Sequence, residues 1–143
     1  GDSITNEQLL ELECDILVPA AKEDQITGEN ADKIKAKLIV EGANGPISAD
    51  ADEIIYNKGI RVIPDILANS GGVIVSYFEW VQDRIGYFWD EDDVNHRLNR
   101  MMTEAFNNVY NTAMEYNTSF RLGAYIYAID KVSKVLKLRG IYG

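Results

Sequence analysis

The sequence has few of the residues from which many catalytic and metal sites are built. Its 143 residues include one cysteine, Cys14, and one histidine, His96. A single cysteine excludes an intramolecular disulfide and is typical of a reducing compartment. Paired cysteines or histidines at metal-ligand spacing are absent, and one histidine gives little basis for a Ser/His/Asp arrangement. We therefore predict no metal site. Cys14 is interpreted as a small packed side chain beside a strand, with a nucleophile as the alternative.

Basic residues and long apolar runs are also scarce. Lys and Arg number 14 against 23 Asp and Glu, which gives a formal net charge of −9. Nucleic-acid binding depends on clustered basic residues, so the charge disfavours it and also disfavours anionic membranes. No apolar run approaches the roughly 20 residues of a membrane span, and no signal peptide is recognisable. We expect a cytoplasmic protein with neither nucleic acid nor membrane as a partner.

Common phosphate-binding and acid–base patterns are missing as well. The sequence contains neither Gly-x-Gly-x-x-Gly nor Gly-x-x-x-x-Gly-Lys. The acidic run at 90–93 is interpreted as the start of a helix, because negative charge favours the positive helix end, with a metal site as the alternative. These absences leave no residue that we predict to be catalytic.

Three short apolar runs dominate what is present, at residues 15–19, 37–41 and 61–63. Helical patterns separate them, and this alternation is typical of parallel strands joined by crossover helices. After Gly72 the pattern becomes helical throughout. We predict an α/β fold, the second half of a Rossmann-like doubly wound parallel sheet followed by C-terminal helices, with further strands preceding Gly1. The helices are expected at residues 6–13, 27–32, 49–58, 73–84, 90–116 and 120–138.

The first of the later helices repeats apolar residues three or four positions apart, which predicts one buried face. These residues are Val73, Tyr77, Trp80, Val81 and either Arg84 or Ile85. We interpret the aromatic residues of 77–80, together with Tyr125, Tyr127 and Tyr142, as packing residues, with a stacking platform as the alternative.

Each strand ends in small residues or in a Gly/Asn turn. Ala20 and Ala21 follow the first strand, Asn44 the second and Asn69 the third. In open parallel sheets, ligands bind beyond the carboxyl ends of the strands. Glycines beside the asparagines permit close approach, and an amide both donates and accepts hydrogen bonds. A nicotinamide with its ribose fits this edge. Alternatively, Asn44 stabilises its own Asn-Gly turn and the glycines serve tight packing.

Ser76 lies one turn into the helix that follows Gly72. Its hydroxyl is expected to face the same edge, unless it is an ordinary helix serine. The edge itself carries no lysine that could transfer a proton.

Residues 14–21, 40–46, 62–80 and 121–142 together resemble glutamate dehydrogenases of the Glu/Leu/Phe/Val dehydrogenase family. The resemblance covers essentially the whole chain, and it corresponds to the C-terminal part of such an enzyme. It implies reversible oxidative deamination of L-glutamate to 2-oxoglutarate and ammonia, with NAD or NADP as cofactor. It also implies a preceding substrate domain and a homo-hexamer. Residues 1–72 would form part of the cofactor-binding domain, and residues 73–143 would be helices that pack on it and toward the active-site cleft.

Carried over by position, the resemblance places Ala20, Ala21, Asn44 and Asn69 at the nicotinamide ribose end. Val73 and Ser76 would shape the pocket for the side-chain carboxylate of the substrate. The catalytic lysine and aspartate of the family, and its glycine fingerprint, have no counterpart here, so we expect the chain alone to be inactive. A non-catalytic module for oligomerisation or partner binding is the alternative.

Three small departures from the family pattern accompany the resemblance. Ser70 stands where alanine is commoner, and residues 47–50 replace a more usual Thr-Thr-Pro-Glu run. Gly123 stands where the family usually has alanine. A helical glycine costs about 1 kcal/mol against alanine, so we expect it to loosen the last helix.

Overall fold

The computed structural model describes residues 3–140 and divides the chain into two compact units, with the division after Asn69. Each unit is described by itself. Ile141 and Tyr142, which end the family resemblance, lie outside the described residues, and so does the packing predicted for Tyr142.

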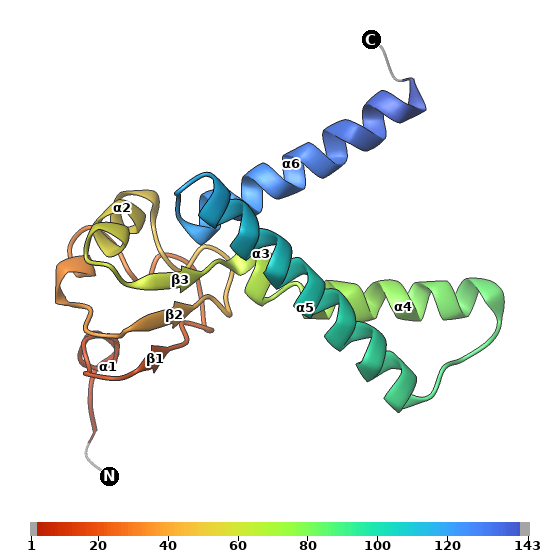
Figure 1. The fold of residues 1–143 in the computed structure, drawn as a ribbon. Helices are drawn as coiled ribbons and strands as arrows, with labels where there is room; N and C mark the ends of the chain where they lie inside the picture. Colours follow the sequence, from red (N-terminus) through yellow and green to blue (C-terminus); the bar gives the residue numbers. More distant parts are fainter. Residues whose placement is uncertain (1–2, 141–143) are drawn as a thin grey trace. The chain divides into compact units, whose positions relative to one another are not determined.

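The first unit is built on a parallel sheet of three strands in the order β1-β2-β3 (Figure 1). The strands are β1 (Ile16–Leu17), β2 (Leu38–Val40) and β3 (Arg61–Ile63). Ile39 lies opposite both Leu17 and Val62, so β2 is the central strand. This parallel sheet confirms the predicted α/β class. β1 is shorter than expected and is an edge strand, and Ile16 in it is 57% exposed.

Four short helices accompany the sheet: α1 (Asn6–Leu10), the 3-10 helix η1 (Ala31–Lys33), α2 (Ala49–Asn57) and α3 (Asp65–Ala68). α2 packs against β3 and η1. The core between them is aliphatic and its largest buried side chains are Ile26, Ile34, Ile39 and Ile55. Cys14 packs against this core and is half-buried, as the packing interpretation expects.

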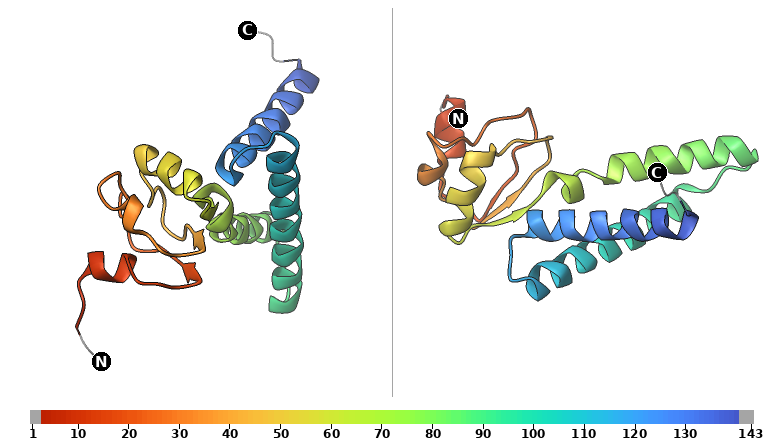
Figure 2. Two further views of the ribbon diagram at one scale, coloured as in Figure 1. Left: turned by 60° about the vertical axis from the view of Figure 1, so that its left-hand side comes forward. Right: turned by 90° about the horizontal axis from the view of Figure 1, so that it is seen from above.

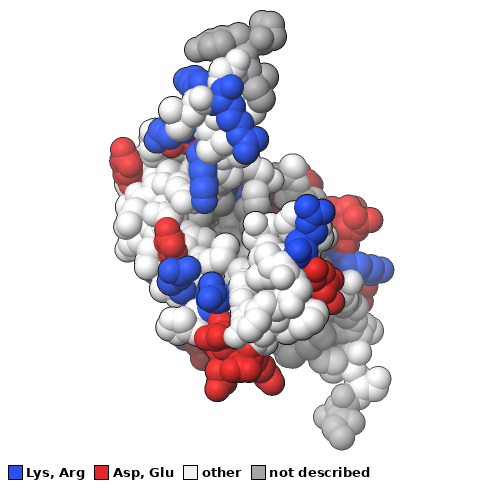
Figure 3. Space-filling model, turned by 90° about the vertical axis from the view of Figure 1, so that its right-hand side faces the viewer, with Lys and Arg blue, Asp and Glu red and all other residues white. Residues whose placement is uncertain are grey.

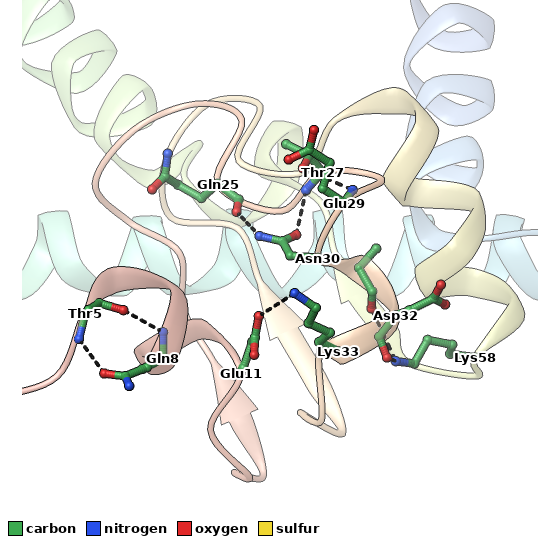
Figure 4. A network of polar contacts seen from close by, with 11 residues as sticks. Thr5, Gln8, Glu11, Gln25, Thr27, Glu29, Asn30, Asp32, Lys33 and Lys58 are labelled. Carbon is green, nitrogen blue, oxygen red and sulfur yellow. Dashed lines mark hydrogen bonds and ion pairs between the residues drawn. The ribbon is translucent and has the colours of Figure 1, made fainter.

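The helix predicted at residues 27–32 is wrong: a turn precedes the short η1 instead. The side chain of Asn30 accepts a hydrogen bond from the backbone N–H of Thr27 (2.9 Å) and donates to the carbonyl of Gln25 (2.9 Å) (Figure 4). Such local bonds offer the backbone an alternative to a helix. α1 also ends earlier than expected, at Leu10, which is its one buried residue.

Lys58, at the end of α2, hydrogen-bonds to backbone groups in and just after η1. Its Nζ donates to the backbone carbonyls of Ala31 (3.2 Å) and Ile34 (3.0 Å). It also donates to the backbone carbonyl of Asp32 (Figure 4). Lys58 is the C-cap of α2 and is followed by Gly59, whose φ of +76° is typical of a glycine that ends a helix. This lysine lies before β3, and hence toward the amino ends of the strands.

The second unit contains the helices α4 (Gly71–Ile85), α5 (Glu91–Glu115) and α6 (Phe120–Arg139). The chain reverses between α5 and α6 at residues 116–119 (Figure 2). α6 packs closely on the end of α5, where Ala113 and Gly123 are both buried. Val109 and Ala113 are the buried residues of α5.

The buried face predicted for α4 is wrong. Val73 is 74% exposed, and Tyr77 and Trp80 are each 56% exposed. The buried residues of α4 are Phe78 and Gln82, one turn apart, so the packing interpretation agrees with the structure at Phe78 and disagrees at Tyr77 and Trp80. Phe78 packs edge-on against Trp89, and Gln82 accepts a hydrogen bond from the backbone N–H of Trp89 (2.6 Å). The period of a helix does not reveal which of two apolar sides faces the neighbouring residues.

Charge on the second unit is distributed unevenly. Figure 3 shows basic side chains gathered along the helix that leads to the grey chain end at its top. In α6 these are Lys131, Lys134, Lys137 and Arg139. Lys134 pairs with Asp130 at 2.6 Å, and this interaction raises the pKa of the lysine. Cations near a helix carboxyl end stabilise the helix dipole. Within the described residues, no helix has the length and apolar character needed to span a bilayer.

Candidate functional site

The loops after β1 and β2 contact each other closely beyond the ends of the strands. The carbonyl of Pro19 accepts hydrogen bonds from the backbone N–H groups of Gly42 (3.1 Å) and Ala43 (3.0 Å). A Cβ built on Gly42 would lie 2.9 Å from the Cβ of Ala20. Only glycine fits at Gly42 without a shift of the neighbouring loop, so two of the predicted loop ends meet here. Ala21 lies next to Ala20 and is exposed.

The loops after β2 and β3 are joined by a bond between two side chains. Asn69 Nδ2 donates to Asn44 Oδ1 at 2.7 Å, and the same nitrogen lies 3.5 Å from the carbonyl oxygen of Gly42. Asn44 is exposed and Asn69 is half-buried. Among the described residues, Asn44 Nδ2 and Asn69 Oδ1 make no hydrogen bond. One amide donor group and one amide acceptor therefore remain at this edge for a ligand.

Two carboxylates that hydrogen-bond to the segments carrying Asn44 and Asn69 were not predicted as site residues from the sequence. Glu41 is 0% exposed, and its Oε2 accepts a hydrogen bond from the backbone N–H of Asp65 (2.7 Å). Asp65 in turn accepts from the N–H of Gly45 through Oδ2 (2.8 Å) and from that of Ile66 through Oδ1 (2.8 Å). The one signal in the sequence was an acidic residue directly after an apolar strand, and it does not reveal burial.

The short helix α3 connects these carboxylates to the amide pair. Asp65 is its first residue, and Asn69 is its C-cap, with the backbone N–H of Asn69 bonded to the carbonyl of Asp65 (3.1 Å). The first N–H groups of any helix have no partner within the helix. Glu41 and Asp65 supply partners for the first two in α3. This helix of four residues was absent from the sequence prediction.

Val73 and Ser76 lie in the second unit, in the first half of α4. They are three positions apart, so their side chains leave the helix on the same side. Both residues are exposed. The orientation predicted for them toward the sheet edge stays a prediction.

Comparison with known proteins shows which family this chain resembles. The family model described as Glutamate/Leucine/Phenylalanine/Valine dehydrogenase matches residues 1–140. A glutamate dehydrogenase of Thermotoga maritima is 58% identical over 142 residues, which are 99% of this chain and 34% of that protein. The cryptic catabolic NAD-specific glutamate dehydrogenase GudB of Bacillus subtilis is 49% identical over 140 residues, 98% of this chain and 33% of that protein.

Solved structures agree with the sequence comparison. The hetero-hexameric glutamate dehydrogenase of Thermus thermophilus in its Leu bound form matches 98% of this chain and 34% of its own, with a TM-score of 0.91 and 32% identity. Glutamate dehydrogenase of Peptoniphilus asaccharolyticus matches 90% of this chain and 32% of its own, with a TM-score of 0.84 and 48% identity. The chain thus spans about a third of the length of the curated relatives it matches.

Proposed function

The chain belongs to the Glutamate/Leucine/Phenylalanine/Valine dehydrogenase family, and from this premise we propose that it forms the C-terminal part of an NAD(P)-dependent glutamate dehydrogenase. The complete enzyme would interconvert L-glutamate with 2-oxoglutarate and ammonia. Relatives at 49–58% identity that are named glutamate dehydrogenases support this substrate, and two of them are named NAD-specific.

We propose that the edge formed by Ala20, Ala21, Asn44 and Asn69 holds the nicotinamide and its ribose. The single observation that carries this is the Asn69–Asn44 hydrogen bond, because it leaves an amide donor group and an amide acceptor beside each other. A carboxamide and ribose hydroxyls need both kinds of partner. The contact of Ala20 with Gly42 keeps bulky side chains out of the same edge. When bound, the nicotinamide would accept or supply the hydride.

The exposed side of α4 supports a role for the second unit in the remainder of the enzyme. Val73, Tyr77 and Trp80 place large apolar surfaces in solvent, and Tyr77 stacks on Trp80 at 5.9 Å between ring centroids. Exposed apolar patches mark interaction surfaces. We propose that the substrate domain of the same enzyme covers this side, with Val73 and Ser76 toward the substrate carboxylate. A homo-hexamer is the proposed assembly of the full-length enzyme.

Kinetics of the intact enzyme test the cofactor site. Asn69→Ala removes the acceptor and the bond to Asn44, and we expect kcat/KM for the nicotinamide cofactor to fall roughly five- to tenfold, since a lost hydrogen bond of about 1 to 1.5 kcal/mol has that effect. Asn57→Ala, the same change at the exposed end of α2, is the matched control and should leave kcat/KM unchanged.

Unchanged kinetics in Asn69→Ala would contradict the cofactor assignment. An intact wild-type protein that shows no glutamate-dependent reduction of NAD or NADP would favour the alternative, a non-catalytic module that uses the same fold for oligomerisation or partner binding.

A further inference from the structure

We propose that Glu41 and Asp65 are positioning residues that hold Asn44 and Asn69 in register for the cofactor. The inference rests on the proposed function of the amide pair. Its basis is that three of the hydrogen bonds between segments 41–45 and 65–69 link the N–H of Asp65 to Glu41, the N–H of Gly45 to Asp65, and the amide of Asn69 to that of Asn44.

The first bond fixes the beginning of α3. Glu41 follows β2, the central strand, and its side chain is fully buried, so its Oε2 has little freedom. By accepting the N–H of Asp65 at 2.7 Å, it fixes the first residue of α3 relative to the sheet. α3 spans four residues, so its start determines where its C-cap, Asn69, lies.

The second bond fixes the loop that carries Asn44. Asp65 Oδ2 accepts the N–H of Gly45, the residue after Asn44, at 2.8 Å. Gly45 has a φ of +55°, a conformation that glycine adopts readily, and in it the N–H is presented to the carboxylate. Asp65 therefore contacts one asparagine loop through its side chain and begins the helix that ends at the other asparagine.

The third bond closes the ring, since Asn69 Nδ2 meets Asn44 Oδ1 at 2.7 Å. These three bonds link the two loops to each other, so neither asparagine can shift without breaking or stretching one of them. Misplacing a binding group by about 1 Å costs up to a hundredfold in rate. The carboxylates need no contact with the cofactor to exert this effect.

Four substitutions in the intact enzyme separate positioning from general stability. Glu41→Leu removes the acceptor while keeping similar bulk, and Glu41→Gln keeps one acceptor oxygen. Asp65→Asn leaves one oxygen for two N–H donors, so either Gly45 or Ile66 loses its partner. Lys58→Met is the matched control, because it removes three hydrogen bonds of the same unit toward the amino ends of the strands.

Binding of NADH and NADPH is measured by fluorescence titration, together with Tm and the kcat and KM values. Glu41→Leu and Asp65→Asn are expected to raise the cofactor Kd roughly tenfold, with a smaller rise in Glu41→Gln. Lys58→Met is expected to lower Tm with the Kd unchanged. Crystal structures of Glu41→Leu and Asp65→Asn should show the Asn69 Nδ2 to Asn44 Oδ1 distance beyond hydrogen-bonding range.

The outcomes distinguish the two proposals. If Asn69→Ala weakens cofactor binding while Glu41→Leu and Asp65→Asn bind like wild type, the positioning inference is overturned and the proposed function stands. If Asn69→Ala binds normally, the proposed function fails, and the variant crystal structures alone decide whether the carboxylates position the pair. An intact 2.7 Å contact in both would overturn the inference. Asp65→Asn decides the matter if Glu41→Leu does not fold.

Discussion

Asn44 and Asn69 stand 25 positions apart in the sequence and share one hydrogen bond at the end of the sheet. Each amide uses one of its two functional groups in this bond. Because an amide is uncharged and carries both a donor and an acceptor, the pair offers a ligand a donor on one side and an acceptor on the other. A charged side chain at either position would remove that balance. The chemistry of the edge therefore depends on single residues and not on its overall charge.

The proposed role of Ser76 also depends on a single group, its side-chain hydroxyl. Ser76→Ala in the intact enzyme is expected to raise KM for glutamate roughly tenfold to a hundredfold, since a hydrogen bond to a carboxylate contributes about 1.5 to 3 kcal/mol. The kcat value should change less. Ser133→Ala, a serine of α6, provides the control. A KM for glutamate equal to that of wild type would remove Ser76 from the substrate pocket.

Asp50 is expected to make the thermal stability of the protein depend on pH. It accepts hydrogen bonds from the Ser48 hydroxyl and from the N–H of Gly28 (3.1 Å). These bonds, that from Ser48 first, lower the pKa of Asp50 below its ordinary value. The lowered pKa means that the stabilisation is complete above the ordinary value of about 3.9 and is lost as the pH falls through it toward the lower folded value.

We therefore expect Asp50→Asn to lower Tm at pH 7, and we expect the gap to wild type to close as the pH falls below about 4. Thermal melts of both proteins between pH 3 and pH 7 measure this gap. Glu53→Gln, at an exposed carboxylate of the same helix, is the control. A gap that stays constant over this range would show that the Asp50 carboxylate does not contribute through its ionised form.

At the residue scale, the sequence predicted the asparagines because parallel strands bring their carboxyl ends to one edge. It did not predict Glu41 or Asp65. A glutamate next to an apolar strand is equally compatible with an exposed strand end, and only the fold reveals that Glu41 is buried against the N–H of Asp65. Contacts between side chains and distant backbone groups leave no periodic signal.

Among the elements, the contact of α5 with α6 depends on a glycine. A Cβ built on Gly123 would lie 2.8 Å from the Cβ of Ala113 and 3.0 Å from its backbone nitrogen. Real Cβ atoms are not found so close to such neighbours, so the two helices approach to a distance that only glycine permits at this position. The residue that was expected to loosen α6 is instead buried in its packing contact.

Gly123→Ala tests whether the gain in helix propensity or the cost of overpacking is larger. Alanine gains about 1 kcal/mol in helix propensity, but overpacking costs about 1 to 3 kcal/mol. We expect a net loss of about 1 kcal/mol in the free energy of unfolding, measured by urea denaturation of the intact protein. Ala113→Gly combined with Gly123→Ala moves the methyl group across the contact and should recover part of the loss beyond the sum of the single changes. A more stable Gly123→Ala protein would contradict the packing account.

Elements with a clear hydrophobic pattern of their own were predicted well, and those that depend on contacts with distant residues were predicted poorly. The strand at residues 61–63 and the helix at 120–138 agree with β3 and α6 within one residue, because hydrophobic pattern and caps coincide there. α3 has a single turn and depends on Glu41 and Asp65 for its first hydrogen bonds, so its own sequence carries no helical period. Around Thr27, hydrogen bonds of the Asn30 side chain replace the expected helix.

At the scale of the whole molecule, the chain spans about a third of the length of the curated relatives it matches. The exposed side of α4 and the exposed edge strand β1 are the surfaces that the remaining two thirds would cover under the proposed function. The sequence predicted the α4 stripe as buried because its apolar period is that of a covered helix.

The most direct test of the cofactor site is a crystal structure of the intact enzyme with NAD or NADP bound. We predict that the nicotinamide or its ribose lies within about 2.7 to 3.2 Å of Asn69 Oδ1 or Asn44 Nδ2, a normal hydrogen-bond distance, with the Asn69–Asn44 bond retained. A bound cofactor whose nicotinamide and ribose contact neither asparagine would contradict the account.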